Sequence, residues 1–292
     1  MGALFSALLV APRSNALPIG AVGKNTALGT VSQGSCCVAV EECPPSSSET
    51  PLPSIARLNG CRPDRTDVED MPTGLDDSHI SFSSSGMQLA NSDFLLSGPV
   101  DPLLALHDLL ELPEHSETPF FYTHRFSALI PFHRMTFSPD AIRVLTTPNA
   151  GGNSENSEAL SFEVLHRLLG ARLLKTEMQI HYQAGAKITD YLCILHGHRL
   201  GVSVTRAMKH TDPAEFTAAD AEALLNKKLY GVNASSEAVS SSDCWERQLL
   251  HIWAQSERIA TILADVWAAL SNELRANTIV VCTVAPNHKW LF

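Results

Sequence analysis

Residues 157 to about 285 carry a regular succession of apolar patterns, and this succession constrains the fold more than any other feature of the sequence. Ser157 can cap an amphipathic helix, which Gly170 ends. Three short runs typical of strands follow, separated by tight turns, at 175–182, 187–195 and 200–207. Strands joined by short turns pair antiparallel, and the continuous apolar run 278–284 is typical of a central, buried strand.

Two helices are predicted between the third strand and the last one. Thr217 and Asp220 form a capping box for the first helix, which Gly231 ends. The second is expected over 243–270, and its buried side carries Trp253, Leu263 and Trp267. The element order αβββ-αα-β predicts an α/β fold, in which helices flank a mixed β-sheet. We expect a single domain over residues 101–292, with its core at about 157–285.

The chain before residue 101 lacks a periodic apolar pattern. Residues 44–100 are rich in Ser and Pro, which favour neither helix nor sheet, so we expect residues 1–100 to be disordered. A helix is predicted to start at Asp101-Pro102 and to stop at Pro113. The aromatic and β-branched stretch 118–147, with its turn signal Ser138-Pro139-Asp140, predicts a hairpin.

The first 40 residues contain no Asp or Glu and leave the location of the protein open. Met1-Gly2-Ala3-Leu4-Phe5-Ser6 fits the pattern for N-myristoylation of Gly2, which would place the protein at a membrane surface. An acid-free start also fits a mitochondrial presequence. The seven Cys lack a disulfide spacing and no apolar run is long enough to span a membrane, so the default is an intracellular protein of the cytoplasm or nucleus.

Asp190 is the most informative candidate residue, because it lies in a mainly apolar strand-like run. A buried carboxylate needs a cation or hydrogen-bond donors. Asp190 is therefore either a metal ligand, which Glu177 could join, or a structural residue paired with one of three bases, Lys187, Arg199 or Arg206. A second candidate site is the turn His196-Gly197-His198, which could bind zinc with His181, although exposed turn histidines have the same pattern.

The element order with an acid in the second strand resembles the PD-(D/E)XK nuclease superfamily. That resemblance implies an Asp at Asp190 and an (E/D)-x-K triplet on the third strand, where two carboxylates hold Mg²⁺. The triplet here is Ser203-Val204-Thr205, so the second carboxylate and the Lys are both absent. Glu177 or Glu163 could replace the missing acid. The resemblance implies a catalytically degenerate site of Asp190, Glu177, Ser203 and Thr205, with no cofactor, or with Mg²⁺ if the site is active.

A second resemblance rests on short segments of the sequence. Ser203-Val204-Thr205-Arg206-Ala207, the segment Leu224 to Gly231 and Leu250-His251-Ile252-Trp253 are similar to the eukaryotic family of the AAC-rich mRNA clone protein. The family implies no established activity, so this resemblance does not distinguish between the functions below.

The charge of the chain is −10, which excludes a generally basic nucleic-acid coat. Residues 164–210 are locally basic, and four of their bases are candidates for tracking a phosphate backbone, Arg172, Lys175, Lys187 and Arg206. We expect a degenerate nuclease-like domain that binds nucleic acid or acts as a protein scaffold, and little or no cleavage. The alternatives are an active Mg²⁺-dependent nuclease and a lipid-anchored interaction protein.

Overall fold

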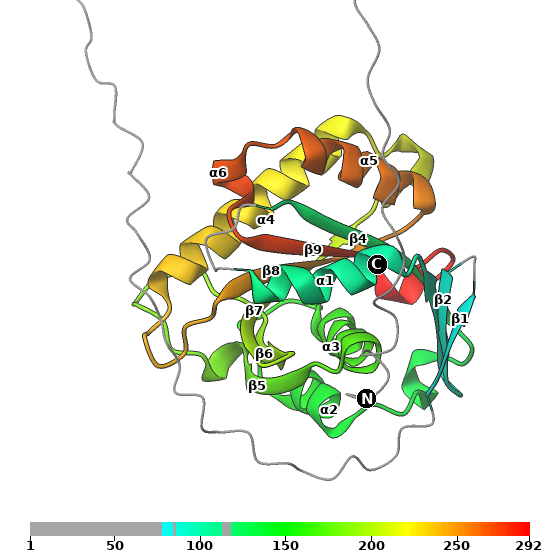
Figure 1. Ribbon diagram of the computed structural model, residues 1–292, viewed down its shortest axis with the longest axis horizontal. Coiled ribbons are helices and arrows are strands. Elements are labelled where there is room, and N and C mark those ends of the chain that lie inside the picture. Colours follow the sequence, from blue (N-terminus) through cyan, green and yellow to red (C-terminus); the bar gives the residue numbers. More distant parts are fainter. Residues whose placement is uncertain (1–77, 84–85, 113–117) are drawn as a thin grey trace, which may run out of the picture. The chain divides into compact units, whose positions relative to one another are not determined.

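The structure, a computed structural model, describes residues 78–83, 86–112 and 118–292 (Figure 1). All of them belong to the second of the two units into which the chain divides, residues 56–292. The strands form one nine-stranded sheet in the order β1-β2-β3-β4-β9-β8-β7-β6-β5. They are β1 (His79–Ser83), β2 (Gly86–Ala90), β3 (Phe94–Gly98), β4 (Phe120–Ala128), β5 (Arg172–Thr176), β6 (Tyr191–Leu195), β7 (His198–Ala207), β8 (Arg247–Ala254) and β9 (Thr278–Val284).

Six α-helices accompany the sheet in the described residues: α1 (Asp101–Glu111), α2 (Pro139–Thr146), α3 (Glu155–Leu169), α4 (Ala218–Ala238), α5 (Glu257–Ala269) and α6 (Asn272–Arg275). The 3₁₀ turns are η2 (Phe132–Arg134), η3 (Glu177–Gln179), η4 (Pro213–Glu215) and η5 (Lys289–Leu291). The mixed sheet flanked by helices confirms the predicted α/β class.

The centre of the sheet is parallel and its two sides are antiparallel. β4, β9, β8 and β7 pair parallel, because a helix connects β7 to β8 and another connects β8 to β9. Short turns join β1 to β2 and β6 to β7, so these strands pair antiparallel. The predicted arrangement of the three antiparallel strands and the buried last strand is therefore confirmed in outline.

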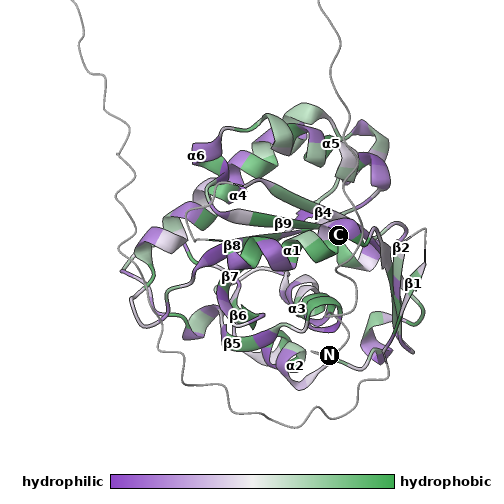
Figure 2. Ribbon diagram, in the orientation of Figure 1, coloured by the Kyte–Doolittle hydropathy of each residue, from purple (hydrophilic) through white to green (hydrophobic). Residues whose placement is uncertain are grey.

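The two faces of the sheet have separate cores. On β8, Leu249 and Trp253 pack with α1, α2 and α3, whereas Leu250 and Ile252 pack with α4 and α5. Figure 1 shows α4 and α5 on one side of β9 and α3 on the other. In Figure 2, β9 is mostly in the hydrophobic colours, as expected for a strand whose seven residues are all buried.

The predicted long helix 243–270 is wrong, because its first half is strand β8. All eight residues of β8 are buried, so its apolar run covers both faces and lacks the alternation of a half-buried strand. The helix begins only after Ser256, whose hydroxyl accepts from the Ile259 N–H at 3.3 Å. Trp253, Leu263 and Trp267 are nevertheless buried as predicted, with Trp253 on the strand.

Four other boundaries differ from prediction. The strand expected at 187–195 is β6, which begins only at Tyr191, so Asp190 lies in the loop before it. The strand expected at 175–182 is β5, which ends at Thr176 and gives way to η3. The hairpin expected at 118–147 is instead β4 followed by α2, because the turn signal is an N-cap: the Ser138 hydroxyl accepts from the Ala141 N–H at 3.2 Å. The capping box of Thr217 and Asp220 is confirmed. The α4 helix continues through Gly231 to Ala238, so this glycine does not end it.

Order begins earlier than predicted. Residues 79–83, 86–90 and 94–98 form β1, β2 and β3, and the inner side chains of β2 and β3 lie in the core, so the predicted disorder is wrong for these strands. Residues 1–77, and with them Gly2 and the candidate targeting segment, lie outside the described residues. Among the helices that the structure describes, none has the length and apolar character to cross a membrane.

Candidate functional site

The candidate site lies where β7 extends past the start of β6. The last paired residues are Tyr191 and Val202, so the backbone of Val204 has no strand partner on that side. Two side chains take the place of the missing strand. The Val204 N–H donates to Asp190 Oδ2 at 2.5 Å, and Lys228 Nζ, from α4, donates to the Val204 carbonyl at 3.0 Å. Asp190 and Lys228 therefore meet at the two polar groups of one residue.

Two further carboxylates surround Asp190. Glu158, in the first turn of α3, is 6% exposed. Glu177 opens η3 directly after β5, and its Oε2 accepts from the Ala150 N–H at 2.7 Å. We call Glu158, Glu177 and Asp190 the acid cluster, because the charge of Asp190 acts on both glutamates. Its members come from the start of α3, the residue after β5 and the loop before β6.

The acid cluster is under electrostatic repulsion. Burial and the charge of Asp190 raise the pKa of Glu158 to about 7. Burial also raises the pKa of Glu177, against the hydrogen bond from Ala150, and the charge of Asp190 adds to the rise. For Asp190 burial raises the pKa, opposed by the Val204 N–H and by the charge of Lys228. Groups with shifts of this kind are common at functional sites.

The structure brings together some of the predicted site residues. The charge of Asp190 acts on Glu177, and Glu177 lies in η3 rather than on the predicted strand. The Ser203 hydroxyl donates to Asp190 Oδ2 at 3.3 Å. Thr205 is buried two residues further along β7. Of the bases expected to neutralise Asp190, none is the partner seen here, since that partner is Lys228.

Glu163 is excluded as a replacement ligand. Its side chain is fully buried and its Oε1 accepts from Arg167 Nε at 2.6 Å. Its Oε2 accepts from the Ser138 N–H at 2.8 Å. Both oxygens are therefore used in fixing α2 against α3, and Glu163 has a structural role.

The predicted phosphate-tracking bases do not form one free surface. Lys175 Nζ lies 2.6 Å from Asp243 Oδ1, which pairs its charge. Arg206 donates to the Leu291 carbonyl at 3.5 Å. Arg172 and Lys187 are exposed. The local excess of bases that the sequence shows is thus reduced by carboxylates from other parts of the chain.

The predicted histidine cluster is correct only in part. His181 lies apart from the hairpin turn, with its Nδ1 2.8 Å from Asp243 Oδ2. His196 lies instead against His107 of α1, with their ring centroids 5.3 Å apart. Across the described ranges, no three or more His, Cys, Asp and Glu side chains are already arranged to hold a metal ion.

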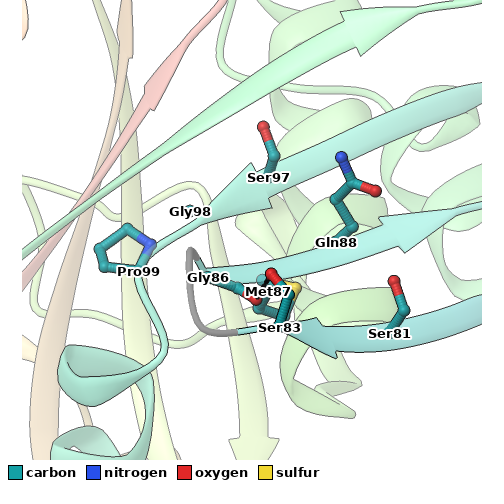
Figure 3. Close-up of a pocket in the computed structure, with 8 residues that line it drawn as sticks. All are labelled: Ser81, Ser83, Gly86, Met87, Gln88, Ser97, Gly98 and Pro99. Carbon is teal, nitrogen blue, oxygen red and sulfur yellow. Dashed lines mark hydrogen bonds between the residues drawn. The ribbon is translucent and has the colours of Figure 1, made fainter.

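A pocket over β1, β2 and β3 lies elsewhere in the sheet. Figure 3 shows Ser81, Gln88 and Ser97 in a row across the three strands, as the strand register requires. The pocket is lined by Ser81, Ser83, Gly86, Met87, Gln88, Ser97, Gly98 and Pro99. None of these residues has a titratable side chain, so the acid cluster is the better candidate for chemistry.

Sequence reasoning missed Glu158 and Lys228. Glu158 directly follows the predicted cap Ser157, so an acid in the first turn of the first helix was a signal for it. Lys228 lies on α4, 38 positions after Asp190. No spacing rule predicts that an acid at the start of a strand will lie near a base on a later helix.

Comparison with known proteins supports one of the two resemblances. No family model matches the chain, and no solved structure matches it. The AAC-rich mRNA clone AAC4 protein of Dictyostelium discoideum is 45% identical over 156 residues, which is 51% of this chain and 23% of that protein. The chain thus spans about a quarter of the length of the curated relative it matches. The resemblance to the AAC-rich mRNA clone protein, seen in the sequence, is confirmed.

Proposed function

We propose that this domain hydrolyses phosphodiester bonds of nucleic acid with the help of Mg²⁺, at the acid cluster. One observation carries the proposal: Asp190 and Lys228 meet at Val204, beside Glu158 and Glu177. The sequence suggested a degenerate site because Thr205 stands where the nuclease superfamily has Lys. Lys228 supplies an ammonium group to the same part of β7 from a different element.

The acid cluster suits Mg²⁺ in charge and in ligand type. Mg²⁺ prefers oxygen ligands and is usually held by one or two carboxylates, several waters and substrate phosphates. Such a site needs fewer than three protein ligands. The charge of Asp190 raises the pKa of Glu158 and of Glu177, and a divalent cation would relieve that repulsion. When bound there, Mg²⁺ would polarise a phosphoryl oxygen and lower the pKa of a bound water.

The residues of the chain would have distinct roles. Asp190 and Glu158 would hold the ion. Lys228, beside them, would stabilise the negative charge that develops as water adds to phosphorus and the P–O bond to the leaving oxygen breaks. Glu177 would accept the proton of the attacking water, because burial raises its pKa toward the range in which a general base is efficient at neutral pH.

A second candidate function has its own support. Asp190 Oδ2 is already bound by the Val204 N–H and the Ser203 hydroxyl, and Lys228 occupies the Val204 carbonyl. These contacts complete the edge of β7 and favour a structural role for both side chains. On this view the domain is a degenerate nuclease-like module that binds nucleic acid or protein without cleavage.

Cleavage assays with matched variants separate the two functions. The full chain is incubated with labelled single- and double-stranded DNA and RNA, and with Mg²⁺ or Mn²⁺. The variants are Asp190→Asn and Lys228→Met, and the control is Lys227→Met, which removes an exposed base from the same helix. Circular dichroism checks that each variant is folded.

We expect cleavage that needs the metal ion, falls at least about a hundredfold in Asp190→Asn and Lys228→Met, and persists in Lys227→Met. Cleavage that is equally fast in Asp190→Asn would place the activity elsewhere or in a contaminant. An intact substrate under all conditions would overturn the proposal and favour the degenerate module.

A further inference from the structure

A group of histidines joins the end of α1 to the β6–β7 turn. His196 and His198 flank Gly197 in that turn, and His196 meets His107 edge-on with ring centroids 5.3 Å apart. His198 Nε2 lies 3.7 Å from Glu111 Oε1. His107 and Glu111 are four residues apart on α1, so one face of the helix presents both. Four nitrogen and oxygen donors thus come from two elements far apart in sequence.

A carboxylate outside the group orients His198. Glu246 Oε2 accepts from His198 Nδ1 at 2.6 Å, and the same carboxylate accepts from the Arg199 N–H at 3.4 Å. This hydrogen bond places the proton on Nδ1 and leaves the lone pair of Nε2 free on the side of Glu111. Histidines that bind metals nearly always donate their second ring nitrogen to a carboxylate or carbonyl in this way.

We propose that His107, His196, His198 and Glu111 bind a divalent transition-metal ion of the Zn²⁺ type. Imidazole nitrogens with one carboxylate are a common ligand set for this ion, at about 2.0–2.2 Å each. The proposal does not rest on the acid cluster. His198 begins β7 and Val204 lies six residues further on, which is roughly 20 Å along a strand.

The side chains must move to reach the ion, because within the described ranges no three such groups already hold that geometry. His107, His196 and Glu111 are exposed and can change rotamer. His198 is half-buried and held by Glu246, so it is the fixed point of the site. His196 has a left-handed backbone, with φ of 50°, which is uncommon for a residue other than Gly.

The test uses the full chain after treatment with a chelator. Co²⁺ is added and its visible absorption is followed, and Zn²⁺ then competes for the site. We expect one ion per chain, and at least a tenfold loss of affinity in His107→Ala and in His198→Ala. The matched controls are His210→Ala, an exposed histidine elsewhere, and His181→Ala, the histidine that the sequence alone would have included.

Both controls should bind Co²⁺ as the wild type does, and binding should weaken from pH 7 to pH 5.5 as the imidazoles take up protons. Binding that survives His107→Ala and is lost in His181→Ala would overturn this site. The absence of binding at millimolar Co²⁺ would overturn it as well. Since His107 and His210 are both exposed, circular dichroism should show the same fold in both variants.

Discussion

Two groups of polar side chains adjoin in this domain and differ in the way they are satisfied. The acid cluster lies at the start of α3 and the start of β6. A buried hydrogen-bond chain begins one turn later on α3, at Ser161, and one residue later in β6, at Tyr191. The two groups thus adjoin at α3 and at the start of β6, but the side chains of the hydrogen-bond chain are almost fully buried, whereas Asp190 and Glu177 are half-buried.

The buried chain links side chains from four strands, β6, β8, β9 and β4, and from α3 through hydroxyl and imidazole groups. Tyr191 Oη lies 2.8 Å from Ser161 Oγ, which lies 2.5 Å from His251 Nδ1. His251 Nε2 lies 2.6 Å from Thr283 Oγ1, which lies 3.0 Å from His124 Nε2. Each internal member has partners on both sides, and His124 Nδ1 at the far end has none.

The two groups also differ in the charge that they carry at neutral pH. Burial lowers the pKa of His124 to about 3 and that of His251 well below its ordinary value, so both rings are neutral at pH 7. Neutral groups with partners cost little to bury. The acid cluster keeps groups of like charge together, which costs stability, and the charge of Lys228 opposes this for Asp190.

Removing the middle of the buried chain should have the largest effect on stability. His251→Ala takes one hydrogen-bond partner from Ser161 and one from Thr283 and opens a cavity beside Trp253, so we expect a loss of about 3–5 kcal/mol in the free energy of unfolding. Urea denaturation measures it, with His210→Ala as the exposed control. A loss below about 1 kcal/mol would mean that the chain contributes little.

The two groups should respond to pH with opposite signs. The pKa of His124 is lower in the folded state than in the unfolded state. The contribution of His124 to the free energy of unfolding is therefore complete above about pH 6.5 and falls on acidification, by about 3 kcal/mol at pH 4. The pKa of Glu158 is higher in the folded state, so stability falls as pH rises from about 4.5 to 7, by about 3 kcal/mol.

The variant Glu158→Gln isolates the second effect. It should be more stable than the wild type at pH 8 and similar to it at pH 4, and the difference should grow between these values. Thermal or urea unfolding across this range gives the difference curve. A constant difference would show that the pKa of Glu158 is the same in the folded and unfolded states, and would remove Glu158 from the acid cluster.

Mg²⁺ should stabilise the protein through the acid cluster and leave the buried chain unaffected. At a hundredfold excess over Kd we expect a gain of about 2.7 kcal/mol at pH 7.5, and a smaller gain at pH 6 because protons then compete for Glu158. Asp190→Asn should lose the effect and His251→Ala should keep it. A gain of equal size in Asp190→Asn would locate the ion elsewhere.

The fold could be predicted from the sequence where one face of an element is buried. The antiparallel strands around Gly197 and the capped start of α4 follow from local patterns and were predicted. β8 was not, because a strand buried on both faces has the same continuous apolar run as a buried helix. The strands β1–β3 were missed because Ser-rich strands at the side of a sheet resemble a solvated linker.

The candidate site was predictable only where it rests on local sequence. Asp190 was found because a carboxylate in an apolar run needs an explanation. Its partner Lys228 comes from α4, the helix that connects β7 to β8, and Asp243, 68 positions after Lys175, neutralises a base that the sequence counts as free. These pairings depend on tertiary structure and cannot be predicted from the residues of a short segment of the sequence.

The ion pair of Lys175 and Asp243 lies between the acid cluster and the neutral buried chain. It brings two charges of opposite sign together, and Asp243 is buried. Asp243 is 2% exposed and Lys175 is 30% exposed. Burial alone would raise the pKa of Asp243, but hydrogen bonds from Lys175 and His181 hold it at about 2. Because folding lowers the pKa of Asp243, its contribution to the free energy of unfolding is present above about pH 4 and is lost as the pH falls toward 2.

We therefore expect Lys175→Met to cost about 1 kcal/mol at pH 7, since Asp243 keeps its bonds to His181, and to cost nothing near pH 2. Urea unfolding at both pH values measures the cost. The control is Arg125→Met, which breaks the exposed pair with Glu257 and should cost less than about 0.5 kcal/mol. Equal losses in the two variants would mean that burial adds nothing to this pair. A cost that persists at pH 2 would show that Lys175 acts by packing of its alkyl chain rather than through the charge of Asp243.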